Sequence, residues 1–189
     1  MPPILERTRR TARHGIGVVV AVVAGPEWAR VVEPEDLARW RRLTPSATWR
    51  FISVPRADGS RTAMAVGEMM ESRRVRPGQL ILLGVGEVGR GVLELVLQGA
   101  IDCAGILAVD VPCEPLPFSD LASEAVIRLV VHQGNEEEPG LVGQLKCADV
   151  DERIIGLNPF ESTRSQVTAS AAEAFLLELV ATIGRRPGI

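Results

Sequence analysis

The sequence predicts a single α/β domain built on a doubly wound, mainly parallel sheet of about six strands. Six short apolar segments recur along the 189 residues, and helical patterns fall between them. The middle segments are apolar at every position, as is typical of parallel strands that helices cover on both faces. Apolar residues make up 46% of the chain, which is enough to fill the core of one domain.

The predicted strands are bounded by turn residues. The second and the sixth contain polar side chains, which indicates positions near the edges of the sheet. In chain order the strands are Gly17–Ala24, Trp49–Val54, Leu80–Leu83, Ala104–Val109, Ile127–Val131 and Arg153–Gly156.

The predicted helices alternate with these strands. The last is the most regular, because its apolar residues form one stripe, Thr168 or Ser170 can cap it, and Gly184 follows it. Residues 1–14 are rich in arginine and are predicted to form a flexible arm, so the domain covers residues 15–189. The helices are Pro34–Leu43, Ala63–Arg74, Gly89–Gln98, Glu138–Cys147 and Ser170–Ile183.

The composition of the chain limits which partners and which cellular compartment we expect. A net charge of −3 provides no general attraction for nucleic acid. No apolar run approaches the roughly 20 residues of a membrane span, and no apolar segment with a cleavage site follows the arginine-rich start, so we expect a soluble protein without a signal peptide. Three cysteines are too few for a disulfide framework and favour a reducing, cytoplasmic compartment. Two distant histidines, His14 and His132, with scattered cysteines predict no metal site, and we expect no cofactor.

The segment Gln79–Leu95, QLILLGVGEVGRGVLEL, carries the strongest functional signal. It combines an apolar strand, a glycine-rich turn and an amphipathic helix. Nucleophile elbows are built in this way, with the pattern G-x-S-x-G. Dinucleotide sites are also built in this way, with the pattern G-x-G-x-x-G.

From about Gly17 onward, the order of motifs resembles the compact α/β-hydrolases of the phospholipase/carboxylesterase type. Residues 82–91, LLGVGEVGRG, resemble the family's elbow motif LxGFSQGG. Residues 103–117 resemble its next strand, AGVVALSGxLP, and residues 128–139 resemble the strand and acid loop PVLxVHGxxDxxVP. The final polar loop, Asn158–Gln166, and the helix after it resemble the end of the family's chain.

The resemblance places Gly86 at the nucleophile position and Glu136 at the acid position, and it places the base within residues 158–166, where no histidine exists. The oxyanion hole would use the N–H of Glu87 and the loop around Pro26, but proline has no N–H and a carboxylate opposes an oxyanion. We therefore expect a degenerate hydrolase that binds a small acyl or ester-like ligand, or a protein partner. The expected ligand-binding residues are Gly25, Trp28, Gly86, Glu87, Asp110 and His132.

Three alternatives remain. Gly84-x-Gly86-x-x-Gly89, with Asp110 at the end of the next strand, fits a Rossmann-like site for NAD(P) or another nucleotide, although the glycines also suit a sharp turn alone. Cys113, His132 and Glu136 could form a displaced nucleophilic site, in which case the protein is an esterase-like hydrolase. A scaffold or homodimer subunit without a ligand is the third alternative.

Overall fold

The computed structural model describes residues 17–55, 58–132, 140–148, 150–157 and 164–185. Its six strands form one sheet in the order β2-β1-β3-β4-β5-β6, and every neighbouring pair is parallel. The predicted fold class is confirmed, and the two half-polar strands lie at the edges as expected. The strands are β1 (Val19–Ala24), β2 (Thr48–Ser53), β3 (Leu80–Val85), β4 (Gly105–Val109), β5 (Val126–His132) and β6 (Glu152–Leu157).

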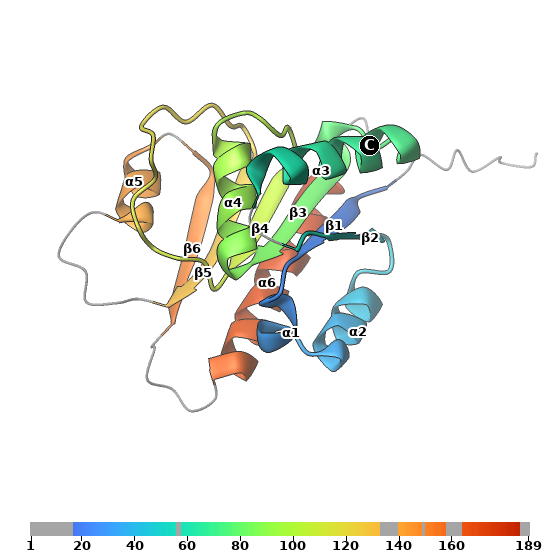
Figure 1. Cartoon of the computed structure of the whole chain (residues 1–189). Helices are drawn as coiled ribbons and strands as arrows, with labels where there is room; N and C mark the ends of the chain where they lie inside the picture. Colours follow the sequence, from blue (N-terminus) through green and yellow to red (C-terminus); the bar gives the residue numbers. More distant parts are fainter. Residues whose placement is uncertain (1–16, 56–57, 133–139, 149, 158–163, 186–189) are drawn as a thin grey trace, which may run out of the picture.

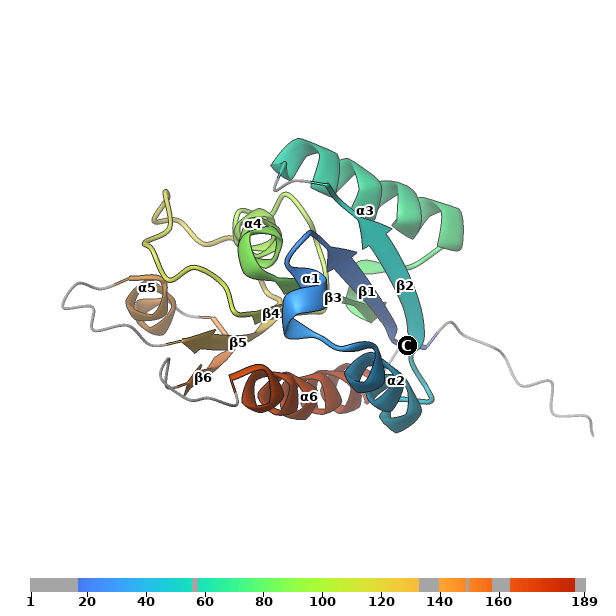
Figure 2. The same cartoon turned by 60° about the horizontal axis from the view of Figure 1, so that its bottom comes forward.

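Helices cover both faces of this sheet. Figures 1 and 2 show α3, α4 and α5 on one face, and α2 and α6 on the other, where α1 also packs. The described helices are α1 (Trp28–Val31), α2 (Pro34–Leu43), α3 (Gly59–Arg73), α4 (Gly86–Leu97), α5 (Leu141–Cys147) and α6 (Arg164–Ile183), with a short 3₁₀ turn, η1, at Pro77–Gln79.

Side chains along each buried strand alternate between two cores. Val19 and Val23 of β1 pack under α3, α4 and α5, whereas Val20 and Val22 pack under α1, α2 and α6. These four valines are each at most 1% exposed, so β1 is covered on both faces, which explains its unbroken apolar sequence.

Several helices begin at residues other than those predicted. The α4 helix begins at Gly86 instead of Gly89, so the glycine-rich segment forms the first turn of the helix. The α3 helix begins at Gly59, because the Asp58 carboxylate accepts a hydrogen bond from the Arg61 N–H at 3.1 Å. The α5 helix begins at Leu141, after Gly140. The short α1 helix has no apolar periodicity and was not predicted.

The α6 helix begins at Arg164, six residues before the predicted start. Its segment 166–183 therefore has the length and mean hydropathy, 1.3, of a helix that can cross a membrane, although 44% of it is buried inside the protein. Ala172, Leu176, Leu179 and Ile183 are fully buried against the sheet. The apolar stripe is thus the core-facing side of a covering helix.

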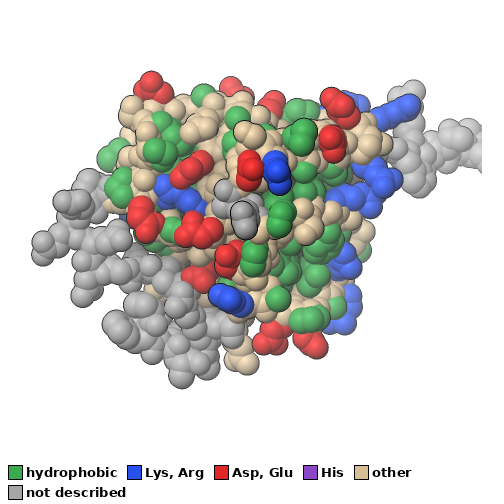
Figure 3. Space-filling view, in the orientation of Figure 1, with side chains coloured by type: hydrophobic (Ala, Val, Ile, Leu, Met, Phe, Trp, Pro, Cys, Tyr) green, Lys and Arg blue, Asp and Glu red, His purple; other side chains and the backbone are tan. Residues whose placement is uncertain are grey.

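Charged side chains are unevenly distributed on the face drawn in Figure 3. Acidic side chains gather over its middle and left, and basic side chains follow its right edge. The first third of the sequence supplies most of the arginines, whereas the only lysine is Lys146. The charge asymmetry of the sequence therefore becomes an asymmetry of the surface.

Candidate functional site

The turn from β3 into α4 lies at the carboxyl end of the sheet, between β1 and β4. Val85 is still extended, and the next residue, Gly86, has a φ of +58° and begins the helix. This left-handed conformation favours glycine. The predicted sharp strand–turn–helix is confirmed, and it sits where open α/β sheets gather their ligands.

Close packing accounts for the glycines around this turn. A Cβ atom on Gly84 would lie 2.6 Å from the Gly89 Cα, and one on Gly89 would lie 2.6 Å from the Gly84 carbonyl carbon. A Cβ on Gly25 would lie 2.4 Å from the Val88 Cγ2. Two positions of the dinucleotide pattern thus have a packing reason of their own. The nucleotide site stays a prediction, which a rise in melting temperature with NAD or NADP would support.

Glu27 lies directly over Gly86. A Cβ atom on Gly86 would be 3.1 Å from the Glu27 Cγ and 3.2 Å from its Cβ. The Glu27 Oε2 is buried and has no hydrogen-bond partner among the described residues. The space above the turn is therefore filled by a side chain from the loop after β1. The sequence indicates Glu27 only as part of the loop around Pro26 that would form the oxyanion hole. No local pattern predicts its contact with Gly86, which lies 59 residues further along the chain.

Trp28 packs and does not project as a free lid. Its ring meets Phe51 of β2 edge to face, with the ring centroids 6.4 Å apart. The Arg41 guanidinium lies 5.1 Å from the Phe51 ring centroid and 5.9 Å from that of Trp49. Trp28 is half-buried against the α6-side core, so its ring is held by packing.

The other predicted residues lie at neighbouring strand ends. Glu87 is exposed in the first turn of α4, and no side chain within the described residues caps that helix. Asp110 follows β4, is half-buried and has a φ of +52°. Its N–H donates to the Val130 carbonyl at 2.7 Å, which extends the β4–β5 ladder.

The displaced nucleophilic site is only partly within the described residues. Cys113 is half-buried, and its Sγ lies 3.9 Å from the Val111 carbonyl oxygen. His132 is the last residue of β5, next to β4, but its side chain lies outside the described residues, as does Glu136. The site stays a prediction. No group of three or more metal-ligating side chains occurs in the described part of the chain.

Arg90 holds the segment that follows β4 against α4. Its guanidinium donates to the carbonyl oxygens of Pro112 and Pro115, each at 3.1 Å, and its Nε lies 2.7 Å from the Glu94 Oε1. The Arg90 side chain is 8% exposed. The sequence does not predict this role of Arg90, because an arginine next to Gly89 in an amphipathic helix is expected on the solvent-exposed face.

The sequence matches no family model and no curated protein. Solved structures do match, and they are esterases and related hydrolases. Esterase PE8 matches with a TM-score of 0.62 at 15% identity, over 87% of this chain and 93% of that one. The esterase domain of a Rhodothermus marinus protein matches with a TM-score of 0.58 at 9% identity, over 93% and 89%. A phospholipase/carboxylesterase from Dyadobacter fermentans matches with a TM-score of 0.57 at 13% identity, over 87% and 91%. The chain therefore has an α/β-hydrolase-like fold.

Proposed function

We propose that this α/β-hydrolase-fold protein binds a small acyl or ester-like ligand at the turn between β3 and α4, without turning it over by serine chemistry. The observation that carries the proposal is Gly86. It occupies the left-handed position at the start of α4, where the elbow motif that this segment resembles has its serine. A glycine there has no atom that can attack a carbonyl carbon.

The remaining parts of a serine-hydrolase site also lack support in the sequence. A nucleophilic hydroxyl needs a base within hydrogen-bond reach. The chain contains two histidines, His14 and His132, and neither follows β6, where the resemblance expects the base. The exposed Glu87 carboxylate in the first turn of α4 opposes the negative charge of a tetrahedral intermediate.

The site retains features that suit binding of an acyl group. The first N–H groups of a helix have no intrahelical acceptor, and the helix dipole favours a partial negative charge at that end. A ligand carbonyl oxygen beside Glu27, at the start of α4, can accept hydrogen bonds from the first turn of this helix, which has no side-chain cap in the described residues. Trp28 follows β1 at the same end of the sheet and, with Phe51, adds aromatic surface there.

Hydrolysis and binding of short esters test the proposal together. We expect no turnover of p-nitrophenyl acetate above background, and we expect methyl propionate to shift the amide NMR signals of residues 86–88. Turnover that is lost in Cys113→Ala or His132→Ala would establish the displaced nucleophilic site instead. The absence of any amide shift at millimolar ligand would remove the binding function.

The substitution Gly86→Ser tests the assignment of the missing base. We expect no esterase turnover in this variant, because a serine without a neighbouring base stays protonated and weakly nucleophilic. The assay is release of p-nitrophenol, with the native protein as the background control. Robust turnover by Gly86→Ser would show that another group of this chain supplies the base.

A further inference from the structure

Two residues from neighbouring strands share the space that a nucleophile would need. Glu27 follows β1, Gly86 follows β3, and these strands pair directly. The Cβ, Cγ and Cδ of Glu27 lie 3.2, 3.1 and 3.6 Å from the Cβ position of Gly86. The aliphatic part of Glu27 thus stands where a side chain of residue 86 would begin.

One oxygen of the Glu27 carboxylate is not matched by the described residues around it. Its Oε2 is buried without a hydrogen-bond partner among the described residues, and it lies 3.2 Å from the Cβ position of Gly25. An ionised carboxylate only accepts hydrogen bonds, and a buried acceptor without a donor is costly. A ligand that brings an N–H or an ammonium to this point supplies the missing donor, whereas a plain ester or a carboxylate anion brings only more acceptors.

We propose that Glu27 takes the place of the nucleophile side chain and determines specificity, so that the site selects acyl ligands that carry an ammonium or another hydrogen-bond donor beside the carbonyl group. This inference rests on the proposed function. In this arrangement Glu27 would accept a hydrogen bond from the ligand's donor, and the first turn of α4 would donate to its carbonyl oxygen.

A pair of isosteric ligands tests the selection. Glycine methyl ester and methyl propionate differ only in an ammonium where the second has a methyl group. At pH 6 the amine is protonated, because α-amino groups titrate near about 7.7. NMR titration of the native protein should give about a tenfold lower Kd for glycine methyl ester, the ratio expected for one charge-assisted hydrogen bond.

Two variants identify the group that causes this ratio of dissociation constants. Glu27→Gln keeps the side-chain length and removes the charge, so the two dissociation constants should become nearly equal. Glu124→Gln removes the same charge from an exposed residue just before β5 and should keep the ratio. A ratio unchanged in Glu27→Gln would overturn the role of Glu27 while leaving the proposed binding function intact. Failure of both ligands to bind the native protein would overturn both proposals.

The steric part of the inference can be measured without a ligand, by a double-mutant cycle. Gly86→Ala adds the Cβ atom that meets Glu27, and Glu27→Gly removes the obstructing side chain. The left-handed φ penalises alanine in both backgrounds, so it cancels in the cycle. We expect Gly86→Ala to lower the melting temperature by about 2–4 °C less in the Glu27→Gly background than in the native one. Equal losses would show that Glu27 does not occupy this space.

Discussion

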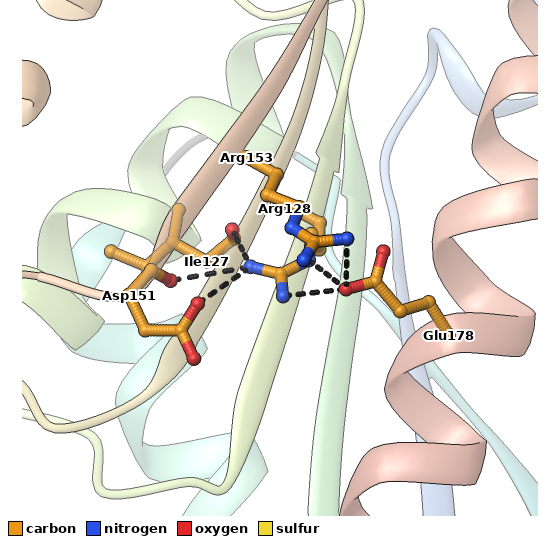
Figure 4. Close-up of polar contacts among 5 residues, drawn as sticks. All are labelled: Ile127, Arg128, Asp151, Arg153 and Glu178. Atoms are coloured by element: carbon orange, nitrogen blue, oxygen red, sulfur yellow. Dashed lines mark hydrogen bonds and ion pairs between the residues drawn. The ribbon is translucent and has the colours of Figure 1, made fainter.

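Two buried charged side chains at opposite ends of the sheet, Arg128 and Glu27, differ in how completely their polar atoms are hydrogen-bonded. Near the amino ends of β5 and β6, the 3% exposed Arg128 donates to Glu178, to Asp151 and to the carbonyl oxygen of Ile127 (Figure 4). Every guanidinium nitrogen of Arg128 has an acceptor. At the carboxyl end, the buried Oε2 of Glu27 has no partner among the described residues.

This difference separates buried polar groups that stabilise the fold from buried polar groups that are available to a ligand. A buried polar network that is fully matched holds elements together, here the strands β5 and β6 and the helix α6, through Glu178 and also Arg153. A buried polar atom left unmatched requires an explanation, and a ligand that supplies the missing donor is one. The cluster around Arg128 thus has a structural role at the amino end, and the unmatched oxygen of Glu27 supports the proposed site at the carboxyl end.

The largest expected effect comes from removing the main partner of Arg128. Glu178→Ala leaves a buried positive charge with only the partly exposed Asp151 beside it, and breaking a buried pair in this way costs about 3–5 kcal/mol of the free energy of unfolding. Asp151→Ala is the matched control. Its carboxylate is 63% exposed, so the expected loss is below about 1 kcal/mol. Urea unfolding measures both.

Equal losses of unfolding free energy in Glu178→Ala and Asp151→Ala would contradict the structural role that we assign to Glu178. They would mean that Arg128 depends on the sum of its contacts and not on Glu178 in particular. A loss of ester or glycine methyl ester binding in Glu178→Ala, with the fold intact, would also contradict the separation of the two ends.

A smaller effect is expected from two glycines of α4 that lie two residues apart. Gly89→Ala places a Cβ 2.7 Å from the Gly84 carbonyl oxygen, a backbone atom that cannot rotate away, and overpacking of this kind costs about 1–3 kcal/mol. Gly91→Ala meets nothing within 4 Å and should stabilise the helix by about 0.5–1 kcal/mol. Thermal unfolding should therefore give shifts of opposite sign, and shifts of the same sign would show that helix propensity outweighs the contact with β3.

The fold was predictable because it depends on local patterns. The continuous apolar run of β1 and the half-polar sequence of β2 already indicate a buried and an edge strand. The start of α6 at Arg164 was missed, because the sequence of its first residues, 164–166, is polar and the clear apolar stripe begins only at Ala172, although Thr168 and Ala169 are already buried. The α1 helix was missed, because four residues are too few for any periodicity.

Only part of the candidate site could be predicted from the sequence, because only part of it depends on local patterns. The left-handed turn at Gly86 follows from the glycine pattern, and the structure confirms it. The contact of Glu27 with Gly86 depends on the register of β1 against β3, which no local pattern encodes. The glycine at position 25 is explained only by the structure, in which its close approach to Val88 brings the loop after β1 onto α4.

The smallest expected effect near neutral pH concerns the cysteines at the two ends of β4. Cys103, just before β4, is 6% exposed, and burial, together with the nearby charge of Asp102, raises its pKa from 9.0 to about 12. Cys113, just after β4, is half-buried, and Cys147 is exposed. At pH 8 a thiol reagent should therefore label Cys147 first, Cys113 more slowly, and Cys103 only when the protein unfolds.

The same burial makes stability depend on pH through Cys103. The folded pKa of Cys103 lies above its unfolded value, so its contribution is fully present below about pH 9 and is lost as the pH rises through 9 toward 12. The free energy of unfolding should fall between pH 8 and pH 10.5 in the native protein and in Cys147→Ala, and fall less in Cys103→Ala. An equal fall in Cys103→Ala, or labelling of Cys103 as fast as Cys147, would show that the amino end of the sheet is as open as the end that carries the site.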